Sequence, residues 1–181
     1  LAGLGIAVVG IGLAYDLALK GTAWSWLPFA VGIPLLPVFG WIGATGSLPA
    51  TAALLLPTGV LAGAALAIGN ALVDVERDRA AGVSSIAAAL GPRQAGRIAE
   101  ALFVVVWIAA VGSAVAADTE PIALAALGVA AGLPIVAADA ARRTGASSAR
   151  REQAWRAEAV GLALAAAVWL GAGAGDWSSS W

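Results

Sequence analysis

Three polar side chains spaced four residues apart, Asn70, Asp74 and Asp78, are the strongest candidates for chemistry in this sequence. On a continuous helix this spacing places them on one face, where the two carboxylates can share one cation or hold two. Glu76 lies between them and would point elsewhere. Mg²⁺ binds proteins through one or two carboxylates and completes its shell with waters and phosphate oxygens. The pattern therefore predicts that Asp74 and Asp78 are metal ligands that present Mg²⁺ to a phosphate group.

Basic residues near these acids are available to hold the same anion. Arg77 and Arg79 lie within the acidic stretch, and Lys20 follows an earlier apolar segment. Guanidinium and ammonium groups both bind phosphate oxygens. The structural alternative is that the acids only end a transmembrane helix and solvate its last turn. The spacing alone does not decide between the two interpretations.

Composition narrows the possible chemistry. The chain of 181 residues contains no cysteine and no histidine. This excludes disulfides, thiolate and imidazole metal ligands, and the side chain that most often acts as a general base near neutral pH. Carboxylates, a few basic groups, hydroxyls and one tyrosine remain. Such a set favours hard, oxygen-liganded cations such as Mg²⁺ over zinc.

The elements that must position these residues are apolar helices. The chain is 61% hydrophobic and 12% charged, with a mean hydropathy of +0.90, far from the average of soluble domains. About 20 apolar residues suffice to span a bilayer. We therefore predict an all-α, polytopic transmembrane helical bundle of about six spans, forming a single transmembrane domain over residues 1–181. The apolar segments are 1–14, 26–43, 50–72, 98–117, 121–138 and 157–174.

The first segment is the exception, because 14 residues reach only about 21 Å as a helix. The chain opens on Leu1 without a methionine or a charged flank, and Tyr15-Asp16 is unlike the small-residue site that follows a signal peptide. We therefore expect an N-terminally truncated chain whose first span is incomplete.

All ten lysines and arginines follow the first, third and fifth segments. The positive-inside rule then places these three loops in the cytoplasm and both termini outside. We expect an integral protein of the cell membrane with the candidate site at its cytoplasmic end. Tryptophans near span ends are typical of an interfacial belt, whereas two deeper ones should pack inside the bundle. The belt residues are Trp24, Trp26, Trp41, Trp155, Trp177 and Trp181, and the deeper ones are Trp107 and Trp169.

The string from Asn70 to Gly91 resembles the second aspartate-rich motif of the UbiA superfamily of intramembrane prenyltransferases. It has the form Asn-x-x-x-Asp-x-x-x-Asp-Arg-x-x-Gly, followed by a hydroxyl-bearing pair and Ala-Leu-Gly. An earlier string, Tyr15 to Lys20, is similar to the family's Tyr-x-x-x-x-Lys loop, and the helix after it also matches. The matching residues there are Trp24, Pro34, Pro37 and Gly40-Trp41. Within and after the acidic motif, the chain departs from the family's pattern at Gly69, Val73 and Val83-Ser84-Ser85.

The resemblance implies a bundle of nine spans around a central cavity, with two aspartate-rich motifs facing each other at the cytoplasmic end. The six segments of this chain resemble spans four to nine, and the spans that carry the first motif are not in this sequence. The implied activity is Mg²⁺-dependent transfer of a polyprenyl group from its diphosphate to an acceptor, commonly an aromatic one in quinone, haem or related lipid biosynthesis. As a fragment, the chain would be inactive or incomplete.

The resemblance also implies roles for single residues. Asp74 and Asp78 would be the catalytic pair that holds Mg²⁺, and Lys20 and Arg79 would stabilise the departing diphosphate. The remaining substrate-binding candidates are Asn70, Arg77 and Tyr15, although Tyr15 has the alternative of an interfacial belt residue. The expected partners are an isoprenoid diphosphate, a lipophilic or aromatic acceptor and membrane lipid, but no nucleic acid.

The loop 80–95 would, by the same resemblance, cover the mouth of the cavity. Within it Ser84-Ser85, the stretch 86–90 and Gly91-Pro92 predict a short capped helix. We expect Asp139 to pair with nearby arginines rather than to face the cavity. Six arginines, two after this helix and four in a long polar loop after the fifth segment, are expected to be interfacial anchors. They are Arg93, Arg97, Arg142, Arg143, Arg150 and Arg151.

Two functions of other classes stay open. One is a transporter or ion-binding membrane protein in which Asp74 and Asp78 coordinate a translocated cation, because intramembrane carboxylates are usually functional. That function predicts acids at mid-span, whereas these two lie at the end of a span. The other is a non-catalytic remnant that packs or binds lipid without turnover.

Overall fold

The computed structural model describes residues 2–143 and 146–173, all of them in helices and short connections. Six of its helices are long and apolar enough to cross a membrane, which confirms the predicted all-α bundle of about six spans. Leu1, Trp177 and Trp181 lie outside the described residues. The elements are α1 (Ala2–Ala14), a π-helical turn η1 (Tyr15–Leu19), α2 (Leu27–Thr45), α3 (Ala52–Val73), α4 (Val75–Ala80), α5 (Ile86–Leu90), α6 (Pro92–Ala116), α7 (Pro121–Arg142) and α8 (Ser148–Gly173).

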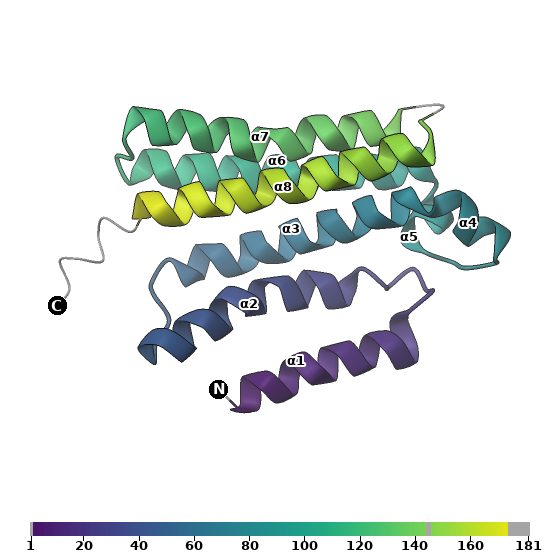
Figure 1. Cartoon of the computed structure of the whole chain (residues 1–181), viewed down its shortest axis with the longest axis horizontal. Helices are drawn as coiled ribbons and strands as arrows, with labels where there is room; N and C mark the ends of the chain where they lie inside the picture. Colours follow the sequence, from purple (N-terminus) through teal and green to yellow (C-terminus); the bar gives the residue numbers. More distant parts are fainter. Residues whose placement is uncertain (1, 144–145, 174–181) are drawn as a thin grey trace.

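Helix α3 is the centre of the bundle (Figure 1). It packs against α2 on one side and against α6 and α8 on the other, while α7 lies on α6 and α8 and α1 contacts α2 at the edge. The α1–α2 connection, the short helices α4 and α5, the end of α7 and the start of α8 all lie at one end of the bundle (Figure 1). The basic segments therefore share one end, as the loop charges predict.

Small residues set the distance between neighbouring helices. A Cβ on Gly63 of α3 would lie 2.7 Å from the carbonyl oxygen of Phe29 and 3.0 Å from Cα of Ala30, so α2 approaches α3 where Gly63 has no side chain. The contact of α7 with α8 is built in the same way, because a Cβ on Gly161 would lie 2.7 Å from Cδ of Pro134. Close backbone approach at small residues is how transmembrane helices gain dispersion energy where lipid removes the hydrophobic drive.

The helices extend further than the apolar segments that predict them. The first segment is not short, because η1 continues α1 to give a candidate span of 18 residues, Ala2–Leu19. The fourth and sixth spans begin at Pro92 and Ser148, and the fifth ends at Arg142. The prediction of a long polar loop after the fifth segment is therefore wrong for most of its length, because α7 continues to Arg142 and α8 begins at Ser148. Hydropathy falls where a helix leaves the hydrocarbon, but charged residues that pair with one another can continue the helix beyond that point.

The two deeper tryptophans pack inside the bundle as expected. Nε1 of Trp107 donates to the carbonyl oxygen of Gly128 at 3.0 Å, and Nε1 of Trp169 donates to Oγ of Ser113 at 2.9 Å. Both rings lie against a core of small residues and Leu127 between α6, α7 and α8. Each indole N–H thus has a hydrogen-bond partner within the bundle.

Candidate functional site

The acidic segment lies where α3 ends and α4 begins. Asp74 separates the two helices, with φ −100° and ψ 5°, and the amide of Asp78 still donates to the carbonyl oxygen of Asp74 at 2.8 Å. The segment is therefore a bent helical end and not the continuous helix on which Asn70, Asp74 and Asp78 would line one face.

A polar cavity of about 350 Å³ opens between this segment and the first turns of α8. Asn70, Asp74 and Arg77 line it together, so the structure brings these three candidates into one place. Asp74 is ion-paired with Arg77. The side chains of the pair are 38% and 75% exposed, so the pair contributes little to stability and is open to exchange. The wall on α8 consists of Ser148, Glu152 and Trp155, so Trp155 faces a cavity rather than serving only as a belt residue.

Asp78 does not line this cavity, but it lies in a chain of contacts that leads to the Lys20 loop. The amide of Val83 donates to the carbonyl oxygen of Asp78 at 2.8 Å, and the next amide, that of Ser84, donates to the carbonyl oxygen of Gly21 at 3.2 Å. Gly21 has φ +76°, a conformation that glycine adopts without strain. The loop after α4 therefore holds the segment that follows Lys20 against the acidic helix.

Arg79 and Tyr15 lie apart from the polar cavity. Nη2 of Arg79 would lie 3.8 Å from a Cβ on Gly91, so its guanidinium reaches toward the junction of α5 and α6. The ring of Tyr15 packs edge-on against Phe29, with ring centroids 5.6 Å apart. This contact fixes η1 on α2. The structure thus separates the candidates into a cavity group, the Asp78–Lys20 side and two outlying residues.

The capped helix after the acidic segment is present as predicted. The Oγ atom of Ser85 accepts a hydrogen bond from the amide of Ala88 at 3.4 Å, and Gly91 ends the helix with φ +84°. Ala87 and Ile86 pack on the core formed by α3, α6 and α7. The short helix is therefore anchored to the bundle beside the acidic segment.

An ion pair between Glu76 and Arg151 ties the acidic segment to α8. Nη1 of Arg151 donates to both carboxylate oxygens of Glu76 at 2.6 Å, and the arginine side chain is only 7% exposed. The hydrogen bond from Arg151 holds the pKa of Glu76 below its ordinary value, against a smaller opposing effect of burial. The prediction that Arg151 is an interfacial anchor is wrong. The sequence did contain a signal for the burial of Arg151, because Arg151, Ala154 and Glu158 recur at the interval of one buried helix face.

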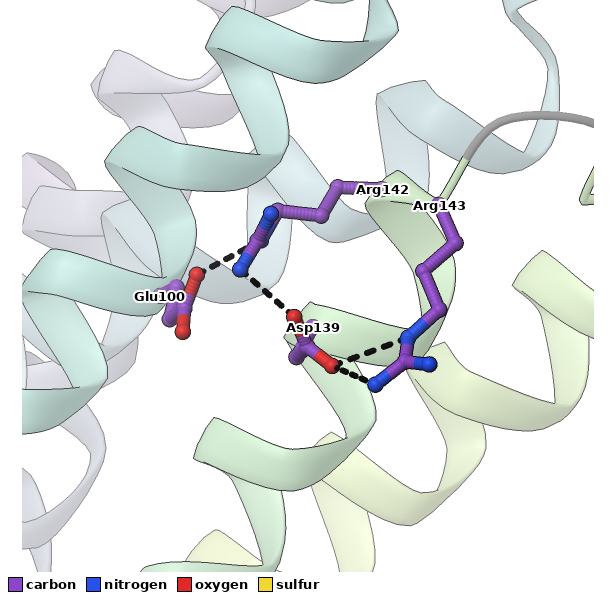
Figure 2. Close-up of polar contacts among 4 residues, drawn as sticks. All are labelled: Glu100, Asp139, Arg142 and Arg143. Atoms are coloured by element: carbon purple, nitrogen blue, oxygen red, sulfur yellow. Dashed lines mark hydrogen bonds and ion pairs between the residues drawn. The ribbon is translucent and has the colours of Figure 1, made fainter.

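A second polar cluster closes the same end of the bundle between α6 and α7 (Figure 2). Arg142 contacts Glu100 at 2.7 Å and Asp139 at 2.5 Å, and Asp139 also accepts from Arg143 at 2.6 Å. Asp139 therefore pairs with arginines, as expected. The Cβ of Arg142 occupies the space beside Gly96 that a side chain there would need. This cluster joins helices and does not touch the polar cavity.

An apolar cavity of about 440 Å³ lies deeper in the bundle, between α2, α3 and α8. Carbon atoms of Pro34, Leu66, Ala159 and Leu162 are among those that line it. Leu66 is one turn before Asn70 on α3, and Ala159 is one turn after Trp155 on α8. The apolar and polar cavities are therefore neighbours along the same two helices.

The donor groups of the polar cavity suit one kind of metal ion. Across residues 2–143 and 146–173, no three acidic side chains gather closely enough to form a metal site by themselves. One or two carboxylates with room for waters and phosphate oxygens is the arrangement that Mg²⁺ uses. Asp74 supplies one such carboxylate to the cavity, whereas Asp78 follows one helical turn later and does not line it.

Comparison with known proteins gives one result. The model of the UbiA prenyltransferase family matches residues 1–159, which cover the acidic segment, all residues that line the polar cavity and the first part of α8. No curated protein and no solved structure matches the chain. The matched part is most of the chain, and the chain belongs to the UbiA prenyltransferase family.

Proposed function

We propose that this protein transfers a polyprenyl group from its diphosphate to a lipophilic aromatic acceptor, with Mg²⁺ bound by Asp74 and Asp78. Family membership supports the reaction class. The observation that carries the proposal is the adjacency of a polar cavity at one end of the bundle and an apolar cavity deeper inside it. A prenyl diphosphate has the same two parts, a charged head and a hydrocarbon tail.

The apolar cavity would take the tail. Its wall is built from proline, leucine and alanine side chains, and its volume of about 440 Å³ lies in the range typical of small-molecule sites. Burial of apolar surface contributes about 25 cal/mol per Å². The tail would therefore supply affinity, while the polar end would supply orientation.

The charged head would lie among Asn70, Asp74 and Arg77. Exchange of Arg77 for Mg²⁺ at Asp74 costs little because the present ion pair is exposed. Arg77 would then be free to bind diphosphate oxygens. Bound Mg²⁺ would supply Lewis-acid neutralisation of the negative charge on the leaving group. Lys20, held near Asp78 by the Gly21–Ser84 contact, would bind the departing diphosphate from the other side.

The end of the bundle that carries this site should face the cytoplasm. All ten basic residues occur in the segments at or near that end, and an excess of Lys and Arg marks cytoplasmic loops. Cysteine labelling tests this orientation, because Ser47→Cys at the opposite end should react with a membrane-impermeant reagent in intact cells. Ser84→Cys should react only after the cells are opened. The reverse pattern would contradict the proposed orientation.

The activity itself is tested with the full-length protein in detergent or vesicles, by following diphosphate release from geranyl diphosphate. Release should require Mg²⁺ and should fall at least 100-fold in Asp74→Asn and in Asp78→Asn, because each loses a charged ligand. Glu120→Gln is the control, since this exposed carboxyl begins α7 at the other end. Wild-type rates in both aspartate variants would refute the proposed site.

A further inference from the structure

The wall of the apolar cavity on α8 changes from small to large side chains with distance from the polar cavity. The lining residues Ala163, Ala165 and Ala166 are followed one turn later by Trp169 and Leu170. Because the first turns of α8 line the polar cavity, the two large residues lie farther from it than the alanines do. We call the part of the apolar cavity at these two residues its outer end.

The wall on α3 changes in the same direction. The last turn of α3 lines the polar cavity, so earlier residues of this helix lie nearer the outer end. Gly59 and Ala62 line the middle of the apolar cavity, and Leu54 and Leu55 line its outer end. From Leu66 to Leu54 this wall is about 18 Å long, at the rise of an α-helix. Both walls therefore leave room for a hydrocarbon chain in the middle and carry larger side chains at the outer end.

A hydrogen bond to α6 fixes the indole ring of Trp169. Its Nε1 atom donates to Oγ of Ser113 at 2.9 Å, and that hydroxyl group donates to the carbonyl oxygen of Ala110 at 2.9 Å. The lining residues on α6 are Val106 and Ala110, one turn apart. Ser113, about one turn further on, accepts from the indole ring and does not line the cavity. The ring therefore reaches from α8 to α6 where the lining of α6 stops.

We propose that Trp169 limits the length of the prenyl chain that the apolar cavity accepts, with Ser113 as the positioning residue that holds its ring at the outer end. The proposal rests on the proposed function, because it needs the diphosphate in the polar cavity and the chain in the apolar one. A chain that ends before the indole ring gains affinity from each isoprene unit that it buries. A longer chain must displace the ring, which the close packing of the bundle opposes.

Calorimetric titration of the full-length protein in detergent measures this limit without turnover. The ligands are non-hydrolysable thio analogues of geranyl, farnesyl, geranylgeranyl and solanesyl diphosphate, each with Mg²⁺. The affinity of the wild type should rise with chain length up to one analogue, and the solanesyl analogue, the longest, should bind at least 10-fold more weakly than that one. Trp169→Ala opens the outer end and should tighten binding of the next longer analogue about 10-fold.

Two further variants act on the same limit without removing the indole ring. Ala166→Leu adds a larger side chain one turn before Trp169 and should move the limit to a shorter analogue. Ser113→Ala removes the hydrogen-bond partner of the ring and should relax the limit less than Trp169→Ala does. Trp107→Ala is the matched control, because Trp107 packs on the same core but does not line the cavity, and it should leave the limit unchanged.

The results distinguish this proposal from the proposed function. The same limit in the wild type, Trp169→Ala and Ala166→Leu would overturn the role of Trp169 and leave the diphosphate site intact. Affinity of the wild type that still rises at the solanesyl analogue would also overturn that role. A Mg²⁺-dependent gain in binding of the geranyl analogue that persists in Asp74→Asn and Asp78→Asn would instead overturn the proposed function.

Discussion

Replacing Glu76 with glutamine should loosen the contact between α4 and α8, because it removes the negative charge that faces the buried guanidinium of Arg151. Nη1 of Arg151 donates to both carboxylate oxygens at 2.6 Å and also lies 3.5 Å from the carbonyl oxygen of Leu72. The variant leaves the arginine charge buried with only neutral partners near these atoms. Since α4 carries Asp78 and begins after Asp74, the same change should disturb the proposed metal site.

The loss of stability in Glu76→Gln can be estimated from the exposure of the two side chains of the ion pair. A hydrogen bond between charged groups contributes about 1.5–3 kcal/mol. Arg151 is 7% exposed but Glu76 is 60% exposed, so solvent screening places the loss at the lower end, about 1.5–2 kcal/mol. For a chain of this length 1 kcal/mol shifts Tm by about 2–4 °C, which predicts a fall of about 3–8 °C.

Thermal unfolding in detergent measures the loss, and a double-mutant cycle assigns it. Arg151→Met removes the buried charge together with the pair and should cost less than Glu76→Gln. The double variant should resemble Arg151→Met alone. Glu152→Gln is the control, because it breaks an exposed pair with Arg156 and should move Tm by no more than about 2 °C. An unchanged Tm in Glu76→Gln, or a larger loss in Arg151→Met, would refute the reasoning.

Three further predictions concern packing, pH and the donor. Gly63→Ala places a methyl group 2.7 Å from the carbonyl oxygen of Phe29 and should destabilise the bundle by about 1–3 kcal/mol in thermal unfolding. Gly32→Ala, where a Cβ meets open space, should stabilise α2 by up to about 1 kcal/mol, and similar Tm values for the two variants would contradict the close contact. Because Arg151 lowers the pKa of Glu76 from 4.5, this pair stabilises the fold above that pH and loses its effect as the pH falls through the lowered pKa. The Tm advantage of the wild type over Glu76→Gln should therefore begin to shrink as the pH falls below 4.5 and should vanish below the lowered pKa, and an advantage that does not change with pH would argue against the ion pair. Lys20→Met should raise the KM for geranyl diphosphate about 10-fold while acceptor KM stays constant, and an unchanged donor KM would remove Lys20 from the site.

The span number and the shared end of the basic loops could be predicted because both depend on composition. Hydropathy reports burial in lipid, and loop charge reports the side of the membrane. The helix ends could not be predicted in this way. Arg142 belongs to α7 because two carboxylates neutralise it, Asp139 of the same helix and Glu100 of α6, and the second contact joins two helices. Pairing across helices leaves no signal in a window of one segment.

Only part of the candidate site could be predicted, because contacts between helices leave no signal in the sequence of one segment. The spacing of Asn70 and Asp74 identified two residues that line the polar cavity. It did not predict the break between α3 and α4 at Asp74, and it did not predict that Asp78 is absent from the lining of that cavity. It also missed the wall on α8, since Glu152 and Trp155 become neighbours of Asp74 only when the last helix packs on the third.

The central claim is that Asp74 and Asp78 bind a prenyl diphosphate through Mg²⁺, and calorimetric titration tests it without turnover. A non-hydrolysable thio analogue of geranyl diphosphate is titrated into the full-length protein with and without Mg²⁺. Binding should be at least 10-fold tighter with the metal in the wild type and in Glu120→Gln, and this gain should vanish in Asp74→Asn and Asp78→Asn. An equal Mg²⁺-dependent gain in the two aspartate variants would contradict the account.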